Sequence, residues 1–276
     1  MTYNTSPHPE RSDRFVLTSA NLLLETNTSH DRHITIPQQH ERLDAHIEAL
    51  RSIQTGKGGR RSINVIGLQE VQSQGGRHNG QTIQRELGYR FGMWQPHSRK
   101  SHGEHIGVIS NVEPDNSEAV RLDKNRYALS LRFGEACVVI VHQMFSDADR
   151  RRLQYEALYE YLEGEEHASV MGDFNEDLWQ FGLRRKFGKA GLVSAFVEDG
   201  KGHPVTLPAP GYGKYRSLKR RIGYGLLGGG LCYDDIYVPK DFRVHATGTV
   251  DSESDHRFVW TDTSTPYGMY MDREAS

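Results

Sequence analysis

Polar side chains that could bind a metal or transfer a proton stand at the ends of several apolar runs in this sequence. In chain order they are Asn21, Glu70, His142, Asp173 with Asn175, Asp234, and Asp255 with His256. The first four positions follow an apolar run, whereas the last two precede one. If the later strands run antiparallel to the earlier ones, all of these side chains meet along one edge of the sheets.

In a cleft that contains three or four carboxylates and two imidazoles, the carboxylates repel one another unless a cation or a proton neutralises their charge. Carboxylate and amide oxygens, without thiolates, favour Mg²⁺ or Mn²⁺ over Zn²⁺. A single Asp or Asn at a strand end is more often a turn residue or a helix cap, and a single His is more often a packing residue. The prediction of a metal site therefore depends on the ordered set and not on one member.

The elements that position these residues are predicted to be mostly strands. Short β-branched-rich runs, and strict alternation as in 127–133, indicate strands bounded by polar residues. The fully apolar run 136–141 indicates a central strand covered on both faces. The predicted strands span residues 15–24, 63–69, 107–112, 127–133, 136–141, 167–171, 235–238, 243–250 and 257–260.

Two longer segments have the spacing of amphipathic helices. Apolar residues recur every three or four positions after Pro37, which suits a helix N-terminus, and they are Leu43, Ile47, Leu50 and Ile53. A second helix is predicted around 148–163, with one buried stripe formed by Leu153, Ala157, Leu158, Tyr161 and Leu162.

The composition indicates one globular domain. The chain has 276 residues, of which 25% are charged, an ordinary fraction for a folded protein. Its net charge of -2 excludes a protein that coats nucleic acid through bulk positive charge, although not one with a local basic site. Because no repeat or low-complexity linker is visible, we expect a flexible segment over 1–14, one domain over 15–262 and a flexible tail over 263–276.

The cysteine content and the chain termini bear on location. Cys137 and Cys232 are too few for a disulfide framework. The N-terminus shows no basic region followed by an apolar one, and no apolar stretch approaches the ~18 residues that cross a bilayer. We therefore expect a cytoplasmic protein that does not use a membrane as a partner.

The ordered set of motifs resembles the endonuclease/exonuclease/phosphatase superfamily, the DNase I-like proteins, over roughly residues 15–262. The motifs are Asn21, Leu68-Gln69-Glu70, His142, Gly172-Asp173-Phe174-Asn175, Asp234 before Ile236-Tyr237-Val238, and Ser254-Asp255-His256. Each motif is short, but six in register are specific. The resemblance implies an α/β (α+β) fold, a four-layer sandwich of two face-to-face mixed sheets flanked by helices.

The resemblance also implies hydrolysis of a phosphate ester with a divalent metal, usually Mg²⁺, for which Mn²⁺ can substitute. Glu70 would be the principal metal ligand, and Asn21 and Asp255 would complete or support the metal shell. These three residues are the metal-binding part of the expected site.

The resemblance assigns the remaining residues to the reaction. Asp173 would deprotonate the attacking water, and Asn175 would hold the phosphate or the water in line. His256 would donate to the phosphoryl oxygens with Asp234 fixing its ring, while His142 would contact the phosphate. The Val141-His142-Gln143-Met144 context is closer to the branch with a catalytic His on the central strand than to the AP endonucleases.

One segment has the composition of a nucleic-acid contact. Residues 211–225 contain five basic and no acidic residues with tyrosines between them, which suits phosphate contacts beside stacked bases. A solvated, glycine-flanked loop is the alternative. The candidate substrate-binding residues are Lys214, Tyr215, Arg216, Lys219, Arg220 and Arg221.

Two further clusters are interpreted as less specific. The group Arg184, Arg185, Lys186 and Lys189 is predicted to be the solvated face of a short helix. The spacing of His102 and His105 is that of a metal-binding pair, but no Cys or third ligand stands at a recognisable interval, so a polar loop beside the cleft, which also contains His97, is favoured over a metal site.

Three functions are consistent with these features. The favoured one is a metal-dependent nuclease or phosphodiesterase acting on nucleic acid, as a monomer and without an obligate protein partner. The second is a phosphatase or phosphodiesterase of a small phosphorylated molecule or a lipid headgroup. The third is an inactive binding module, which would have no need of the intact set Glu70, Asp173, Asn175, Asp255 and His256.

Overall fold

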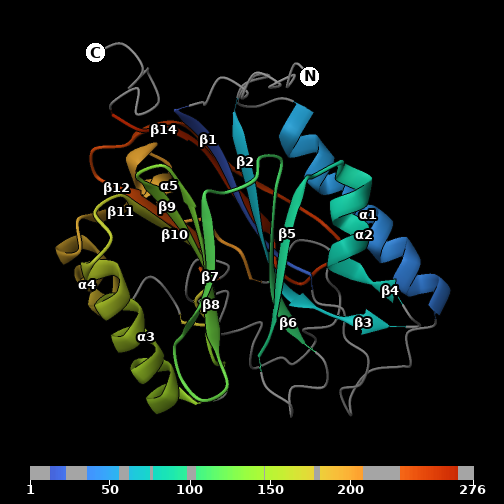
Figure 1. The fold of residues 1–276 in the computed structure, drawn as a ribbon, viewed down its shortest axis with the longest axis horizontal. Helices are drawn as coiled ribbons and strands as arrows, with labels where there is room; N and C mark the ends of the chain where they lie inside the picture. The colour runs from blue at the N-terminus through green and yellow to red at the C-terminus, as the bar shows by residue number, and fades with distance from the viewer. Residues whose placement is uncertain are drawn as a thin grey trace, which may run out of the picture.

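Two mixed six-stranded sheets face each other in the computed structural model and carry helices on their outer sides (Figure 1). This arrangement confirms the four-layer sandwich expected from the sequence. The structure describes residues 13–22, 36–55, 62–74, 77–97, 104–145, 147–176, 181–207 and 231–266.

The first sheet contains the N-terminal and C-terminal strands. β1 pairs in parallel with β2 and antiparallel with β14. The strand order is β13 (Arg243–Val250), β14 (Phe258–Ser264), β1 (Arg14–Asn21), β2 (Ile63–Val71), β6 (His105–Ser110) and β5 (Phe91–Pro96). A short ribbon, β3 (Ser73–Gln74) with β4 (Arg77–His78), follows β2.

The second sheet contains the middle of the chain. β9 pairs in parallel with β10, and β12 runs antiparallel to β10. The strand order is β11 (Leu192–Ser194), β12 (Asp234–Pro239), β10 (Ala168–Asp173), β9 (Ala136–His142), β8 (Tyr127–Phe133) and β7 (Asn116–Arg121).

The longer helices cover the outer faces of the sandwich (Figure 1). α1 (Ile36–Thr55) and α2 (Asn79–Leu87) lie on the first sheet, and α3 (Ala148–Glu163) and α4 (Phe181–Lys189) lie on the second. α5 (Ala195–Glu198) is a single turn. Pro37 occupies the first turn of α1, and the four apolar residues predicted for that helix are buried. No helix among the described residues is long and apolar enough to cross a membrane.

The buried face of α3 differs from the predicted stripe. Leu153 is 52% exposed, whereas Gln154 and Tyr155 are buried with Leu158 and Leu162. The side-chain oxygen of Gln154 accepts a hydrogen bond from the Met144 amide at 2.9 Å, and the Tyr155 hydroxyl donates to the carbonyl of Phe174 at 2.7 Å. These tertiary hydrogen bonds rotate the helix away from the orientation that apolar periodicity predicts.

The sequence analysis did not predict the edge strands β5, β7 and β11, the last of which has only three residues. The side chains of β5 are mostly half-buried, and β7 alternates between exposed and half-buried residues, so neither has a strongly apolar pattern. The first strand, β1, begins at Arg14, and the last strand, β14, ends at Ser264.

Apolar side chains from both sheets fill the space between them. The sheets approach closely where Gly67 of β2 faces Ile140 of β9. A Cβ atom added at Gly67 would lie 2.7 Å from Cγ2 of Ile140, well inside van der Waals contact. This contact lies three residues before Glu70 and two before His142, so it sets the sheet spacing next to the polar strand ends.

Candidate active site

Strand register brings the polar strand ends together at one edge of the sandwich. In the second sheet, Asp173 lies opposite His142 on one side and opposite Asp234 on the other. In the first sheet, Asn21 lies opposite Gln69, the residue before Glu70. The arrangement follows from the strand directions, because ends of parallel strands and starts of antiparallel strands share an edge.

The Asn21 side chain joins the two sheets. Its amide nitrogen donates to Oε1 of Glu70 at 3.1 Å and to Oδ2 of Asp173 at 3.0 Å. Asn21 is fully buried, so these hydrogen bonds are shielded from water. The amide therefore fixes the separation of two carboxylates that belong to different sheets.

Glu70 adopts a backbone conformation that most residues avoid. Its φ of 56° lies in the left-handed region, and the register between β2 and β6 shifts between Leu68 and Val71. Burial, together with repulsion from the carboxylates of Asp255 and Glu104, raises the pKa of Glu70 to about 8. This concentration of negative charge is the environment that a divalent cation would neutralise.

The segment after β10 holds Asp173 in a tight turn. Asn175 has a φ of 50°, its amide donates to Oδ1 of Asp173 at 2.7 Å, and its side chain donates to the Gln143 carbonyl at 2.9 Å. Gly172 has a φ of 151°, and a Cβ atom there would lie 2.0 Å from the carbonyl oxygen of Val141. Only glycine fits that position, because backbone occupies the space of a side chain.

Asp234 and His256 form a hydrogen-bonded pair between the sheets. Nδ1 of His256 lies 2.6 Å from Oδ2 of Asp234, and the His256 amide donates to Oγ of Ser254. Burial lowers the pKa of His256, but attraction to Asp234, Asp173 and Asp255 outweighs it and holds the pKa well above its ordinary value. The imidazolium form is therefore the stable one in this site.

Two imidazoles approach the same oxygen of Asp173. Nε2 of His142 lies 3.9 Å from Oδ2 of Asp173, and Nε2 of His256 lies 4.0 Å from that atom. Burial and repulsion from Arg126 hold the pKa of His142 well below its ordinary value, so this ring is neutral. Burial, together with repulsion by Asp234, raises the pKa of Asp173.

Arg126 and His97 complete the site and were not assigned to it from the sequence. Nη1 of Arg126 lies 3.4 Å from Nδ1 of His142, and Nε2 of His97 lies 3.3 Å from that same nitrogen. Burial lowers the pKa of Arg126, while the carboxylates of Glu104, Glu70 and Asp173 raise it. A guanidinium remains charged at any pH near neutrality, so the site contains a fixed positive charge.

Two groups of polar side chains in the cluster could bind a cation. Ligand atoms of Asp173, Asp234 and His256 lie within 4.8 Å of one another and could hold a metal ion. However, the 2.6 Å contact between Asp234 and His256 is a hydrogen bond, which favours an acid–base array at that place. The repelling carboxylates of Glu70 and Asp255 are the better match to a hard cation.

The predicted substrate contacts lie outside the described residues, whereas part of the two less specific clusters is described. Residues 208–230, which include Lys214, Tyr215, Arg216, Lys219, Arg220 and Arg221, are not described. On α4, Arg185, Lys186 and Lys189 are exposed, as expected for a solvated face. His105 lies 3.2 Å from His78, and His102 is outside the described residues.

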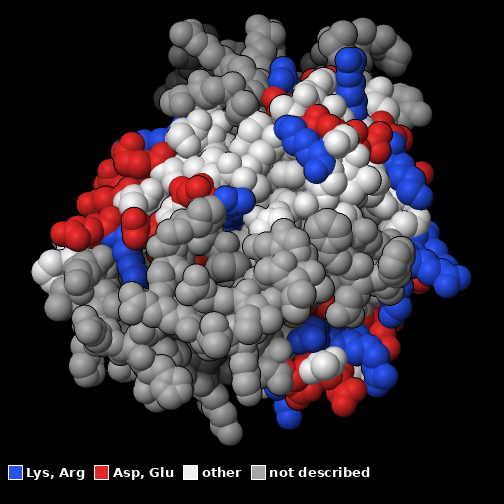
Figure 2. Space-filling view, turned by 180° about the vertical axis from the view of Figure 1, so that it is seen from behind, with Lys and Arg blue, Asp and Glu red and all other residues white. Residues whose placement is uncertain are grey.

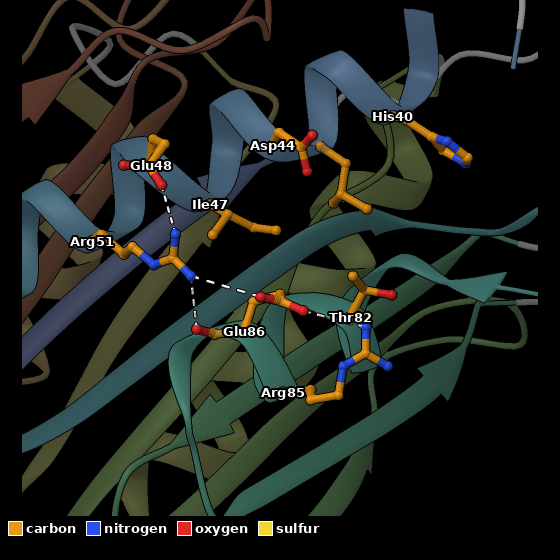
Figure 3. A pocket seen from close by; sticks show the side chains of 9 residues that line it. His40, Asp44, Ile47, Glu48, Arg51, Thr82, Arg85 and Glu86 are labelled. Carbon is orange, nitrogen blue, oxygen red and sulfur yellow. Dashed lines mark hydrogen bonds and ion pairs between the residues drawn. The ribbon is translucent and has the colours of Figure 1, made fainter. Parts of the chain in front are cut away.

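A groove of about 330 Å³ lies between α1 and α2 and shares no residue with the strand-end cluster (Figure 3). Arg51 crosses it and pairs with Glu48 at 2.6 Å and with Glu86 at 3.7 Å. These ion pairs face solvent and partly neutralise one another, so the groove lacks the buried, converging polar groups of the strand-end cluster. The strand-end cluster is therefore the candidate active site.

Comparisons with known proteins agree with this geometry. A sequence profile of the Endonuclease/Exonuclease/phosphatase family matches residues 19–256. No curated protein matches the sequence. A Bacteroides vulgatus endonuclease/exonuclease/phosphatase superimposes with a TM-score of 0.66 at 15% identity, over 91% of this chain and 99% of that one.

Two solved structures with more specific names share the fold. A humanized D. rerio TDP2 gives a TM-score of 0.60 at 14% identity, over 92% of this chain and 100% of that one. The 3′ phosphatase NExo from Neisseria, bound to product DNA hairpin, gives 0.58 at 15% identity, over 89% and 98%. The profile match spans most of the chain, and the protein belongs to the Endonuclease/Exonuclease/phosphatase family of phosphate-ester hydrolases.

Proposed function

We propose that this protein is a divalent-metal-dependent nuclease or phosphodiesterase that cuts nucleic acid by in-line attack of water. The observation that carries the proposal is the Asn21 amide, which joins Glu70 to Asp173 at a place where two imidazoles also converge. Phosphoryl transfer needs a positioned nucleophile and neutralisation of the phosphate oxygens, and this arrangement has groups for both.

Glu70, Asn21 and Asp255 would hold the metal ion. Their oxygen donors suit Mg²⁺, with Mn²⁺ as a substitute, and the raised pKa of Glu70 reflects a surplus of negative charge. When bound, the ion supplies charge neutralisation at the phosphate and lowers the pKa of an oxygen that it contacts.

The chain's own residues would carry the proton transfers. Asp173 takes the proton of the attacking water, since its raised pKa makes it a stronger base than an ordinary carboxylate. His256, held by Asp234, donates to a phosphoryl oxygen from Nε2. Neutral His142 donates to the phosphate, and the Arg126 guanidinium beside it attracts the anionic substrate.

Three features support nucleic acid as the substrate. Phe145, three residues after His142, is 61% exposed, and an exposed aromatic ring beside a phosphate site can stack on a base. The backbone of Leu207 pairs with that of Leu231, three residues before Asp234, and in the sequence these two residues flank the basic stretch. TDP2 and a DNA-bound 3′ phosphatase share the fold, which is compatible with this reading.

The described residues on the face shown in Figure 2 form no basic track. On the face shown in Figure 2, basic and acidic side chains of the described residues are interspersed. The positive charge for substrate binding would therefore come from Arg126 inside the site and from residues 211–225 in the sequence.

A substrate panel tests the proposal. The full chain, freed of metal, is assayed with Mg²⁺ or EDTA on single- and double-stranded DNA, RNA, 5′-tyrosyl DNA, abasic DNA, inositol polyphosphates, a sugar phosphate and sphingomyelin. We expect hydrolysis of at least one nucleic acid, abolished by EDTA and reduced by orders of magnitude in Glu70→Gln. Glu163→Gln, at an exposed position on α3, is the matched control.

The other outcomes separate the alternatives. Hydrolysis of only the inositol polyphosphates, the sugar phosphate or sphingomyelin would replace the nucleic-acid proposal with a small-molecule or lipid-headgroup phosphatase. Full activity in EDTA would overturn the metal requirement. We further propose that the protein acts as a monomer in the cytoplasm, where its two buried cysteines, which form no disulfide, remain reduced.

A further inference from the structure

A second group of ligand-type side chains lies on the other side of β12 from the active site. One ligand atom from each of His203, Cys232 and Asp235 lies within 4.8 Å of the other two. Cys232 and Asp235 are fully buried, and the side chain of His203 is 6% exposed. The cluster is therefore enclosed by protein.

Neighbouring contacts hold the carboxylate in place. Nδ1 of His203 lies 2.8 Å from Oδ2 of Asp235, and the Ser194 hydroxyl donates to Oδ1 of Asp235 at 3.0 Å. Adjacent residues of a strand face opposite sides, so Asp234 points to His256 while Asp235 points to His203. The two carboxylates thus belong to separate sites.

We propose that His203, Cys232 and Asp235 bind a divalent metal ion of intermediate softness, for which the donor set favours Zn²⁺. Thiolate, imidazole and carboxylate are the three donor types of protein zinc sites, whereas Mg²⁺ and Ca²⁺ avoid thiolate. Zinc–ligand bonds of about 2.0–2.3 Å place ligand atoms roughly 3–4 Å apart, so a small contraction of the cluster suffices. Ser194 orients Asp235 from outside the ligand set.

The metal would join two segments that the backbone already pairs. The Thr206 amide donates to the Leu231 carbonyl at 2.9 Å, and the Leu231 amide donates to the Leu207 carbonyl at 2.7 Å. His203 lies on the first segment and Cys232 on the second. A bound ion would cross-link these two described segments, and it would stabilise the folded chain because the unfolded chain does not hold the ligands together.

The same segments support the active site. Oγ1 of Thr206 accepts hydrogen bonds from the amides of Tyr233 and Asp234, each at 3.1 Å. Through these hydrogen bonds the proposed ion would stabilise the backbone around Asp234. It takes no part in the hydrolysis.

Cobalt substitution tests the proposal without relying on activity. The metal-free full chain is titrated with Co²⁺ in excess Mg²⁺, which occupies sites made of hard oxygen ligands. We expect a thiolate-to-cobalt charge-transfer band that saturates at one equivalent and disappears when Zn²⁺ is added. One equivalent of Zn²⁺ should also raise the melting temperature of the wild-type chain.

Matched variants show which thiolate gives the charge-transfer band. Cys137 is the other buried thiol and lies 3.2 Å from the Ser130 hydroxyl, so Cys137→Ser should keep the band while Cys232→Ser loses it. Glu70→Gln should also keep it, which separates this site from the catalytic metal. His203→Gln is a second ligand variant in case Cys232→Ser fails to fold.

Three results would overturn the proposal. The wild-type chain could give no charge-transfer band, Cys232→Ser could retain the band in full, or Cys137→Ser could remove it as completely as Cys232→Ser. The first of these results needs no variant, so the proposal stays falsifiable even if both ligand variants are unstable.

Discussion

His256 and Asp234 form a 2.6 Å hydrogen bond that connects the two sheets of the sandwich. Asp234 is the first residue of β12, and His256 lies two residues before the start of β14. Because each partner is anchored in a different sheet, the charge state of one imidazole depends on how the two layers are positioned.

Asp234→Asn should shift the pH dependence of hydrolysis. The Asp234 carboxylate helps to hold the pKa of His256 well above its ordinary value, so His256 remains protonated as the pH rises. Without that charge the imidazolium loses its proton at lower pH. The alkaline limb of the kcat/KM profile therefore shifts to lower pH. We also expect about a 10²- to 10⁴-fold loss in rate. Asp241→Asn, at a half-exposed carboxylate after β12, should leave the profile in place; an unchanged profile in Asp234→Asn would contradict the assignment.

The metal-free protein should lose stability as the pH rises from about 4.5 to about 8. Glu70 has a folded-state pKa of about 8 against an ordinary value of 4.5, so in that window the folded state binds more protons than the unfolded state. The free energy of unfolding then falls with pH, by up to about 1.4 kcal/mol for each pKa unit. Glu70→Gln should flatten this part of the curve when unfolding is measured by urea in EDTA. Equal slopes in Glu70→Gln and the wild type would show that the carboxylate is not destabilised.

Arg126→Gln should impair catalysis although no motif marks this residue. The guanidinium is the fixed positive charge beside His142, and its loss removes an electrostatic contact with the phosphate. We expect kcat/KM to fall by about 10²- to 10³-fold, the range for a lost donor at a developing negative charge. Arg121→Gln removes an exposed arginine from β7 and serves as the control. Equal activities of the two variants would remove Arg126 from the site.

Phe145→Ala should weaken binding of oligonucleotides selectively. Stacking of a base on an aromatic ring contributes about 1–3 kcal/mol, so KM for single-stranded DNA or RNA should rise by about tenfold or more. A small aliphatic phosphodiester offers nothing to stack and should be cut equally well. Leu153→Ala removes another exposed apolar side chain, at 52% exposure, as a control. A uniform change on both kinds of substrate would argue against a stacking role.

The sequence predicted the central strands and the principal polar cluster because their patterns are local. The apolar run 136–141 and the helix 148–163 coincide closely with β9 and α3. Leu153 was placed on the wrong face because periodicity counts apolar residues only. In the structure, hydrogen bonds of Gln154 and Tyr155 decide which side of α3 is buried.

Arg126 and Glu104 were missed because the strands that follow them were not placed in the sheets. Arg126 precedes β8, which runs antiparallel to β9, and Glu104 precedes β6, which runs antiparallel to β2. The rule that located Asp234 would have located both, once the pairing was known. His97 follows the edge strand β5, whose weak apolar pattern gave no signal.

The contact between Gly67 and Ile140 lets an interior residue determine how far apart the polar groups of the candidate active site lie. A methyl group at position 67 would push the two sheets apart, because its Cβ would lie 2.7 Å from the Ile140 side chain. The 3.0 Å bond from Asn21 to Asp173 would be stretched by that displacement, although no polar atom had been altered. The thickness of the apolar layer between the sheets therefore sets the distances between polar groups at the edge of the sandwich.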